Sequence, residues 1–291
     1  MDRENKRRSG FSEPSATVVA MSDRTFQVVL AVLGTSYIVL IILLIAADFG
    51  YLALTKNTSE SRWMLILHPV MEALSKVEIR NSIILSLLAC TASAILSLWV
   101  AVPLGYIITR HRNIWSEILD TFMDIPIVLP PLVLGVSLLI LFQFWPFRLF
   151  ARSVVYEVPA VIIAQFTVAA AYAVRTMKAT FELINPRCEQ VALTLGCTRA
   201  QAFGNVVLPQ AGRGILTAFT LAWARSLGEF GPLLIFAGAT RNKTEVLSTT
   251  VFLELTIGDL SGAVAVSLIM VFAAAIVLVI ARIWGQRSVI L

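Results

Sequence analysis

"QVVLAVLGTSYIVLIILLIAA", residues 27–47, decides the fold because it is long enough to cross a bilayer and contains no charged residue. The charge-free run begins at Thr25 and exceeds the apolar region of a signal peptide. We therefore interpret it as a membrane anchor, with cleavage as the minor alternative. The whole chain of 291 residues is 58% hydrophobic and 14% charged, which predicts that lipid is its main solvent.

Further apolar runs predict an all-α integral membrane protein with six transmembrane helices. The expected spans are 27–47, 82–109, 127–145, 158–174, 214–236 and 262–284. A soluble core does not explain them, because its helices rarely need about 18 consecutive apolar residues. We expect residues 1–26 to form a disordered tail. Residues 27–291 are expected to form the transmembrane domain, whose largest loop is 185–209.

The distribution of basic residues predicts the orientation, since cytoplasmic loops retain Lys and Arg. With the N-terminus inside, 14 of the 23 basic residues lie on the cytoplasmic side and eight on the opposite side. Arg225, inside a span, is the remaining one. Both termini are therefore expected in the cytoplasm, and the net charge of +5 requires no nucleic-acid partner.

The sequence lacks the signatures of a metal site, a disulfide framework or an enzyme. Cys90, Cys188 and Cys197 form no Cys-x-x-Cys pair, and the histidines are His68 and His111. No Gly-Lys dipeptide occurs, so a P-loop is absent and the chain is not expected to hydrolyse ATP. We predict no catalytic residue, cofactor or metal in this chain.

The loop 185–209 carries local signals for two short helices. Asn185 can cap a helix that starts at Pro186, and Gly196 can end it. Thr198, with Gln201 three residues later, predicts a capping box for the second helix. Such a compact protrusion can lie on the membrane surface or insert into a groove of a partner protein.

This loop resembles the EAA loop of permease subunits of ATP-binding-cassette (ABC) importers, which docks as a coupling helix on an ATPase. The pattern E-x-x-A-x-x-x-G is followed by Leu-Pro twelve residues after the glycine. The usual glutamate position holds Gln190, and an alanine position holds Val191. The residues to which the resemblance assigns ATPase coupling are Glu189, Gln190, Ala192, Gly196, Leu208 and Pro209.

The strings "LPPLVLG" and "LGEFG" are similar to the importer subgroup that carries molybdate, tungstate or sulfate. The resemblance covers about residues 81–281 and implies the type I importer permease fold, an inner-membrane location in a prokaryote and a permease homodimer. It also implies separate ATPase subunits, which bind ATP and Mg, and an external solute-binding protein. Molybdate or tungstate is the leading substrate, with sulfate as the alternative.

Two charges inside a predicted span mark a candidate pathway. Arg225 and Glu229 lie four residues apart and can pair on one helical face, where they either border the translocation path or neutralise each other. The neighbouring residues that favour helix breaks or close packing complete the set of candidate gate residues: Ser226, Gly228, Pro130 and Pro131. Asp120 and Asp124 are interpreted as a solvated first helical turn rather than an acid–base pair.

Two function classes compete with an importer permease. A stand-alone channel or secondary transporter would carry flux without ATP, and a membrane scaffold would use the loop only to recruit a soluble protein. No internal repeat indicates a transporter built from two halves.

Overall fold

The computed structural model describes residues 23–55, 70–111 and 113–287, and these residues form helices and connecting loops. The predicted tail therefore lies largely outside the described residues. The chain divides into two compact units between Asp48 and Phe49. The first unit contains most of α1 (Asp23–Thr55), whose segment Arg24–Leu52 is apolar and long enough to cross a membrane. All sites described below belong to the second unit.

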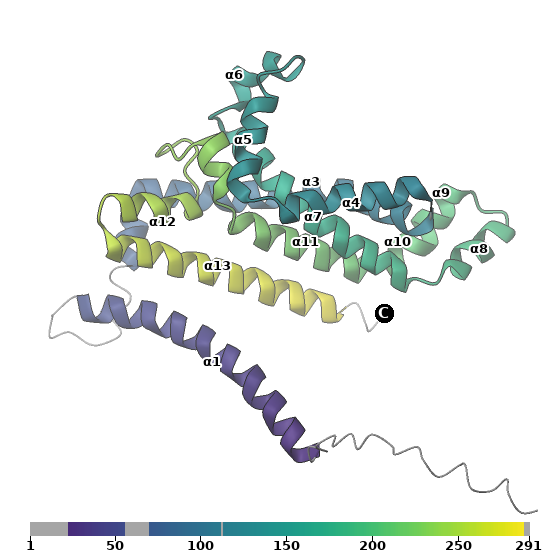
Figure 1. Cartoon of the computed structure of the whole chain (residues 1–291), viewed down its shortest axis with the longest axis horizontal. Coiled ribbons are helices and arrows are strands. Elements are labelled where there is room, and N and C mark those ends of the chain that lie inside the picture. The colour runs from purple at the N-terminus through teal and green to yellow at the C-terminus, as the bar shows by residue number, and fades with distance from the viewer. Residues whose placement is uncertain (1–22, 56–69, 112, 288–291) are drawn as a thin grey trace, which may run out of the picture. The chain divides into compact units, whose positions relative to one another are not determined.

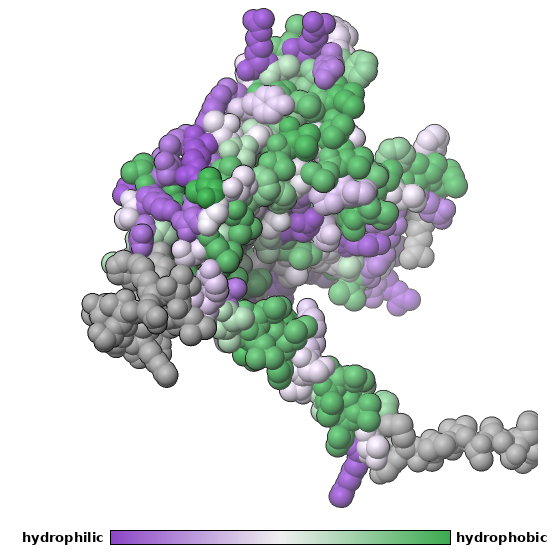
Figure 2. Space-filling model, turned by 60° about the vertical axis from the view of Figure 1, so that its left-hand side comes forward, coloured by the Kyte–Doolittle hydropathy of each residue, from purple (hydrophilic) through white to green (hydrophobic). Residues whose placement is uncertain are grey.

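The second unit is a bundle of long helices with short helices at both ends (Figure 1). Its long members are α3 (Val77–Arg110), α7 (Val158–Leu183), α11 (Gly212–Leu227) and α13 (Leu260–Arg287). At one end lies α12 (Leu247–Thr256), and at the other lie α8 (Pro186–Thr194) and α9 (Arg199–Ala202). We call these the α12 end and the α8 end. Hydrophilic side chains gather at the α12 end, and broad apolar areas lie beside them (Figure 2).

The remaining elements connect the bundle. α4 (Ile114–Val128) packs along α7, and α5 (Pro131–Leu141) points away from the bundle, followed by η1 (Phe147–Leu149) and α6 (Ala151–Val154) (Figure 1). After α9 the chain continues through η2 (Phe203–Val207) and α10 (Leu208–Gln210). The short element η3 (Leu233–Ala237) follows α11 and packs against α5.

Small residues on α3 let its backbone approach α7. Among its buried residues are serines, alanines and a glycine spaced three or four apart: Ser82, Ser86, Ala89, Ser93, Ser97, Ala101 and Gly105. A Cβ added at Gly105 would lie 2.9 Å from the Cβ of Met177 on α7, so only glycine fits there. Ser93 Oγ donates to the Ile162 carbonyl at 3.0 Å, which satisfies a polar group in the helix interface.

Four of the six predicted spans coincide with helices long and apolar enough to cross a membrane, in α1, α3, α7 and α13. The third, predicted over 127–145 with prolines that favour a helix break, is a bent pair, in which α4 and α5 meet at an angle of 111°. The break falls at Leu129 and Pro130, where the prolines cannot continue the backbone hydrogen bonds. Counted as one span, the bent pair brings the number of spans to five within the described residues.

The predicted fifth span, 214–236, is also interrupted. α11 ends at Leu227 with Gly228 as its C-cap, so its 16 residues fall short of a full span. Gly228, which the sequence predicts to favour a helix break or close packing, weakens the helix there together with Gly231 and Pro232. The all-α fold is confirmed, but two of its predicted spans are broken helices.

Candidate functional site

The loop 185–209 forms the two short helices that its capping residues predict. The Asn185 side chain accepts a hydrogen bond from the Arg187 backbone N–H at 3.0 Å and caps α8. Gly196 has a φ of 91°, a left-handed conformation that favours glycine and turns the chain after α8. Thr198 and Gln201 form the predicted capping box at the start of α9.

The two neighbouring polar residues on α8 face different surroundings. Gln190 is exposed, whereas only 12% of the Glu189 side chain is exposed. Glu189 accepts a hydrogen bond from the Tyr106 hydroxyl, and its Oε2 lies 3.4 Å from Arg110 Nε on α3. In this structure the bundle itself therefore holds the Glu189 carboxylate, and the assignment of Glu189 to ATPase coupling stays a prediction.

The other residues assigned to coupling are divided between the surface and the interior. Ala192 is buried, Leu208 is half-buried, and Gly196 and Pro209 are exposed. Two apolar residues, Val191 on α8 and its C-cap Leu195, are 56% and 80% exposed. These two side chains offer an apolar contact surface at the α8 end.

A groove of about 550 Å³ lies between the end of α3 and the two short helices. Its lining includes Tyr106, Arg110, Glu189, Leu193, Arg199 and Phe203. The Tyr106 ring packs edge-on against Phe203, with 4.7 Å between ring centroids. The loop is thus attached to α3 by both a polar and an aromatic contact.

The predicted pair in the interrupted fifth span is present. Arg225 Nη1 lies 2.7 Å from Glu229 Oε2, and the Arg225 guanidinium lies 5.6 Å from the centre of the Tyr172 ring. The Glu229 side chain is 1% exposed, whereas that of Arg225 is 29% exposed. The buried carboxylate therefore holds a guanidinium that remains partly accessible, an arrangement suited to a weak anion contact.

Ser226, predicted beside this pair, faces the interior of the bundle. Its side chain is 1% exposed, and its carbonyl accepts a hydrogen bond from Gln165 Nε2 at 3.2 Å. The Ser226 hydroxyl is buried within this chain, and the assignment of Ser226 as a gate residue stays a prediction. The backbone contact indicates a packing role.

The segment that begins with the gate candidates Pro130 and Pro131 lies against the residues that follow α11. A Cβ added at Gly231 would lie 2.8 Å from the Pro131 Cβ, and one added at Gly135 would lie 2.9 Å from the Pro232 Cα. The start of α5 and the residues after α11 are therefore packed backbone to backbone. A Cβ added at Gly228 would lie 3.9 Å from the Ala224 carbonyl oxygen, an ordinary contact, and Gly228 is the C-cap of α11.

The acidic pair on α4 is not a solvated first turn. Asp120 and Asp124 lie beyond the first turn of α4, which begins at Ile114. Asp120 Oδ2 is 2.7 Å from Lys178 Nζ, and Asp124 Oδ2 is 3.0 Å from Arg175 Nη2, so both pair with basic residues of α7. These contacts join α4 to α7.

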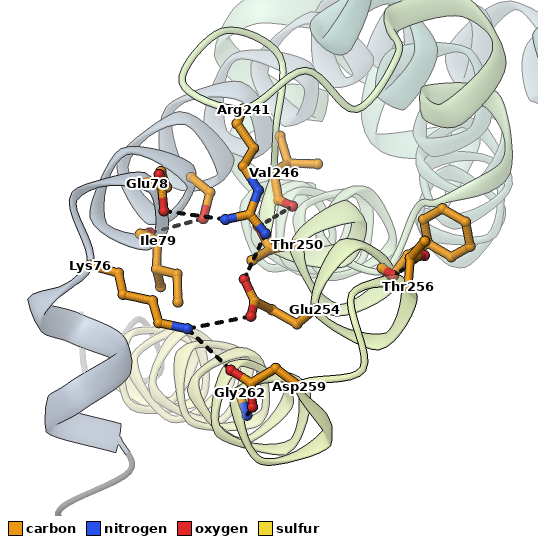
Figure 3. A network of polar contacts seen from close by, with 12 residues as sticks. Lys76, Glu78, Ile79, Arg241, Val246, Thr250, Glu254, Thr256, Asp259 and Gly262 are labelled. Carbon is orange, nitrogen blue, oxygen red and sulfur yellow. Dashed lines mark hydrogen bonds and ion pairs between the residues drawn. The ribbon is translucent and has the colours of Figure 1, made fainter.

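A network of charges at the α12 end was not predicted. Lys76 Nζ lies 3.2 Å from Asp259 and 3.4 Å from Glu254, and Arg241 lies 3.0 Å from Glu254 and 3.2 Å from Glu78 (Figure 3). The Glu254 side chain is fully buried between the two cations. We call these five residues the charge network. The two partners of each ion pair lie at least 13 residues apart in the sequence, so no pattern within one helical turn could have revealed them.

The surroundings of the charge network shift several pKa values. The Gly262 backbone N–H donates to Asp259 and, against the effect of burial, lowers the pKa of that carboxyl to about 2. Burial acts to lower the pKa of Lys76, but the contacts with Asp259 and Glu254 outweigh it and raise that pKa. Glu245 is 2% exposed, and burial raises the pKa of its carboxyl against the opposing effects of Thr250 and Arg241.

This fold defines a multi-pass membrane subunit with a projecting loop. The family described as "Binding-protein-dependent transport system inner membrane component" matches residues 101–288, and the chain belongs to this family of ABC importer permeases. The chain is accordingly an inner-membrane protein, and its family implies ATPase and solute-binding partners. The relatives to which it is similar are permease proteins rather than enzymes.

Two relatives and one solved structure illustrate the match. The sulfate transport system permease protein CysT of Salmonella typhimurium is 31% identical over 84% of this chain and 88% of its own length. The molybdate/tungstate transport system permease protein WtpB of Pyrococcus abyssi is 31% identical over 71% of this chain and 76% of its own. A chain of a bacterial alginate ABC transporter is 16% identical, covers 91% of this chain and 95% of its own, and has a TM-score of 0.70, which shows the shared fold.

Proposed function

We propose that this permease imports a tetrahedral oxyanion, with molybdate or tungstate as the leading substrate and sulfate as the alternative. The support comes from relatives named for both groups of substrates and from the strings "LPPLVLG" and "LGEFG". The structural observation that best supports an anionic substrate is the Arg225 guanidinium, which is partly exposed and is held by the buried Glu229 carboxylate. Because the carboxylate offsets its charge, the guanidinium attracts an anion without retaining it.

In the proposed assembly, two copies of this chain meet two ATPase subunits and one solute-binding protein. ATP and Mg are bound by the ATPase, and both termini and the α8 end lie in the cytoplasm. The loop 185–209 receives the ATPase through its exposed face, which includes Val191 and Leu195. Closure of the ATPase then moves α4, α5, α7 and α11, and the packed segments at Pro131 and Gly231 move together to switch access.

The test is ATP-dependent uptake of molybdate into proteoliposomes that contain this chain with the ATPase and binding protein encoded beside it. We expect uptake that requires ATP and is competed by tungstate more strongly than by sulfate. Stronger competition by sulfate would move the assignment to sulfate. Uptake that persists without ATP would favour a channel or secondary transporter, and assembly without flux would overturn an oxyanion substrate.

A variant arm of the same experiment tests the pathway residue. We expect Arg225→Gln to lower molybdate uptake about tenfold, the loss of one charge-assisted contact. Arg213→Gln, at an exposed arginine in the first turn of α11, is the matched control and should transport at the wild-type rate. Equal rates for Arg225→Gln and wild type would remove Arg225 from the anion path.

A further inference from the structure

Glu189 and Gln190 are adjacent on α8 but point in different directions, as successive helical residues do. Gln190 is exposed, while Glu189 turns toward α3. A carboxylate that binds the ATPase would be expected on the exposed side of α8. The placement of Glu189 instead raises the question of what its contacts within the chain do.

Both contacts of Glu189 come from one face of α3. Tyr106 and Arg110 lie four residues apart, so their side chains project together near the end of that helix. The Tyr106 hydroxyl donates to Oε1, and Arg110 Nε approaches Oε2 to 3.4 Å. The Arg110 and Glu189 side chains are 11% and 12% exposed, so solvent screens their interaction less than at an open surface.

The same two α3 residues also contact the elements on either side of α8. Arg110 Nη2 donates to the Ile184 carbonyl at the end of α7 at 3.1 Å. The Tyr106 ring packs edge-on against Phe181 of α7, at 5.8 Å between centroids, and against Phe203 of η2. Glu189 therefore completes a joint in which α3, α7, α8 and η2 meet.

We propose that Glu189 is a positioning residue that ties the ATPase-facing loop to α3 through Tyr106 and Arg110. This inference rests on the proposed function, in which the loop receives motion from an ATPase. With the joint intact, displacement of α8 moves the end of α3. Without it, α8 still offers its exposed face to the ATPase but shifts independently of the bundle.

The test compares Glu189→Gln, Tyr106→Phe and the double variant in the assembled transporter. The ATPase should copurify with each variant as with wild type, while uptake driven by ATP falls about tenfold on loss of the charge-assisted hydrogen bond. The double variant should fall no further than the worse single variant, because both changes remove one shared contact. Glu182→Gln, at an exposed glutamate in the last turn of α7, is the matched control and should transport normally.

Amide hydrogen exchange of α8 on the same variants provides a readout that needs no transport. We expect faster exchange in Glu189→Gln and Tyr106→Phe and unchanged exchange in Glu182→Gln. Loss of ATPase copurification in Glu189→Gln would show a direct ATPase contact and overturn the proposal, as would wild-type uptake or unchanged exchange. If wild type itself lacks ATP-driven uptake, the proposed function fails, while faster exchange would still support the joint.

Discussion

The two ends of the bundle are held by different kinds of contact. At the α12 end the charge network joins α3, the loop before α12, α12 itself and the turn into α13 through four ion pairs. At the α8 end the carboxylate of Glu189 connects α8 to α3. The comparison indicates that the α12 end is built as a fixed base, whereas the α8 end has a joint at which motion can enter.

Removal of the Glu254 carboxylate, at the centre of the charge network, should have the largest effect on the stability of the bundle. We expect Glu254→Ala to lower the free energy of unfolding by about 3 kcal/mol, because Lys76 and Arg241 then face each other without the buried anion between them. Thermal unfolding of the purified chain in nanodiscs measures the change. The matched control, Glu78→Gln, removes a carboxylate that is 38% exposed and should cost less than about 1 kcal/mol. Equal losses in the two variants would contradict a network centred on Glu254.

Backbone strain at Gly196 in the loop 185–209 should have a smaller effect, confined to the α8 end. Gly196→Val places a β-branched residue at a φ of 91°, which costs about 1–2 kcal/mol locally, although a Cβ there meets no neighbour. We expect ATP-driven uptake to fall while the thermal midpoint of the bundle stays unchanged. Gly212→Ala, where a Cβ also has open space, is the control. Normal uptake by Gly196→Val would show that the turn after α8 is not needed for coupling.

The buried Glu245 beside the charge network makes the fixed end sensitive to pH. Burial raises the pKa of this carboxyl, so the folded chain holds the proton more tightly than the unfolded chain. Its contribution to stability is full below the ordinary pKa of a glutamate and is lost as the pH rises through the raised value. Glu245→Gln cannot ionise and should therefore be more stable than wild type at alkaline pH, by up to about 2 kcal/mol, and similar at acid pH.

Thermal midpoints of both proteins across about pH 5 to pH 9 check this sign, since the range extends upward from near the ordinary glutamate value. A constant difference between Glu245→Gln and wild type would show that Glu245 does not titrate in that range. A variant less stable than wild type at alkaline pH would show that the carboxylate is stabilised by its neighbours.

Features set by neighbouring residues were predictable from the sequence. The caps at Asn185 and Thr198 and the turn at Gly196 depend on residues within one helical turn, and all three are present. The break at Pro130 was also predicted, because proline cannot donate a backbone hydrogen bond wherever it lies. The 111° direction that α5 takes after the break depends on its packing against η3, which no local pattern contains.

Features set by distant partners were not predictable. Nothing in the sequence around Lys76 or Glu254 distinguishes either residue from a charge at the surface. Only the folded bundle brings the two together. Glu189 could be assigned to the loop, but its direction depended on Tyr106 in another helix. The pair of Arg225 and Glu229 was an exception, because four-residue spacing on a helix already places the two charges within reach.

The backbone contact between Pro131 and Gly231 also constrains how the chain is made. α5 leaves the ribosome early, yet the segment against which it packs emerges only after α7, α8 and α11 have been synthesised. Since α5 has 11 residues, it is too short to span the bilayer by itself while it waits. Membrane insertion of this protein must therefore leave α5 without its native neighbour until translation has passed Gly231, and its final placement is a late step of biogenesis.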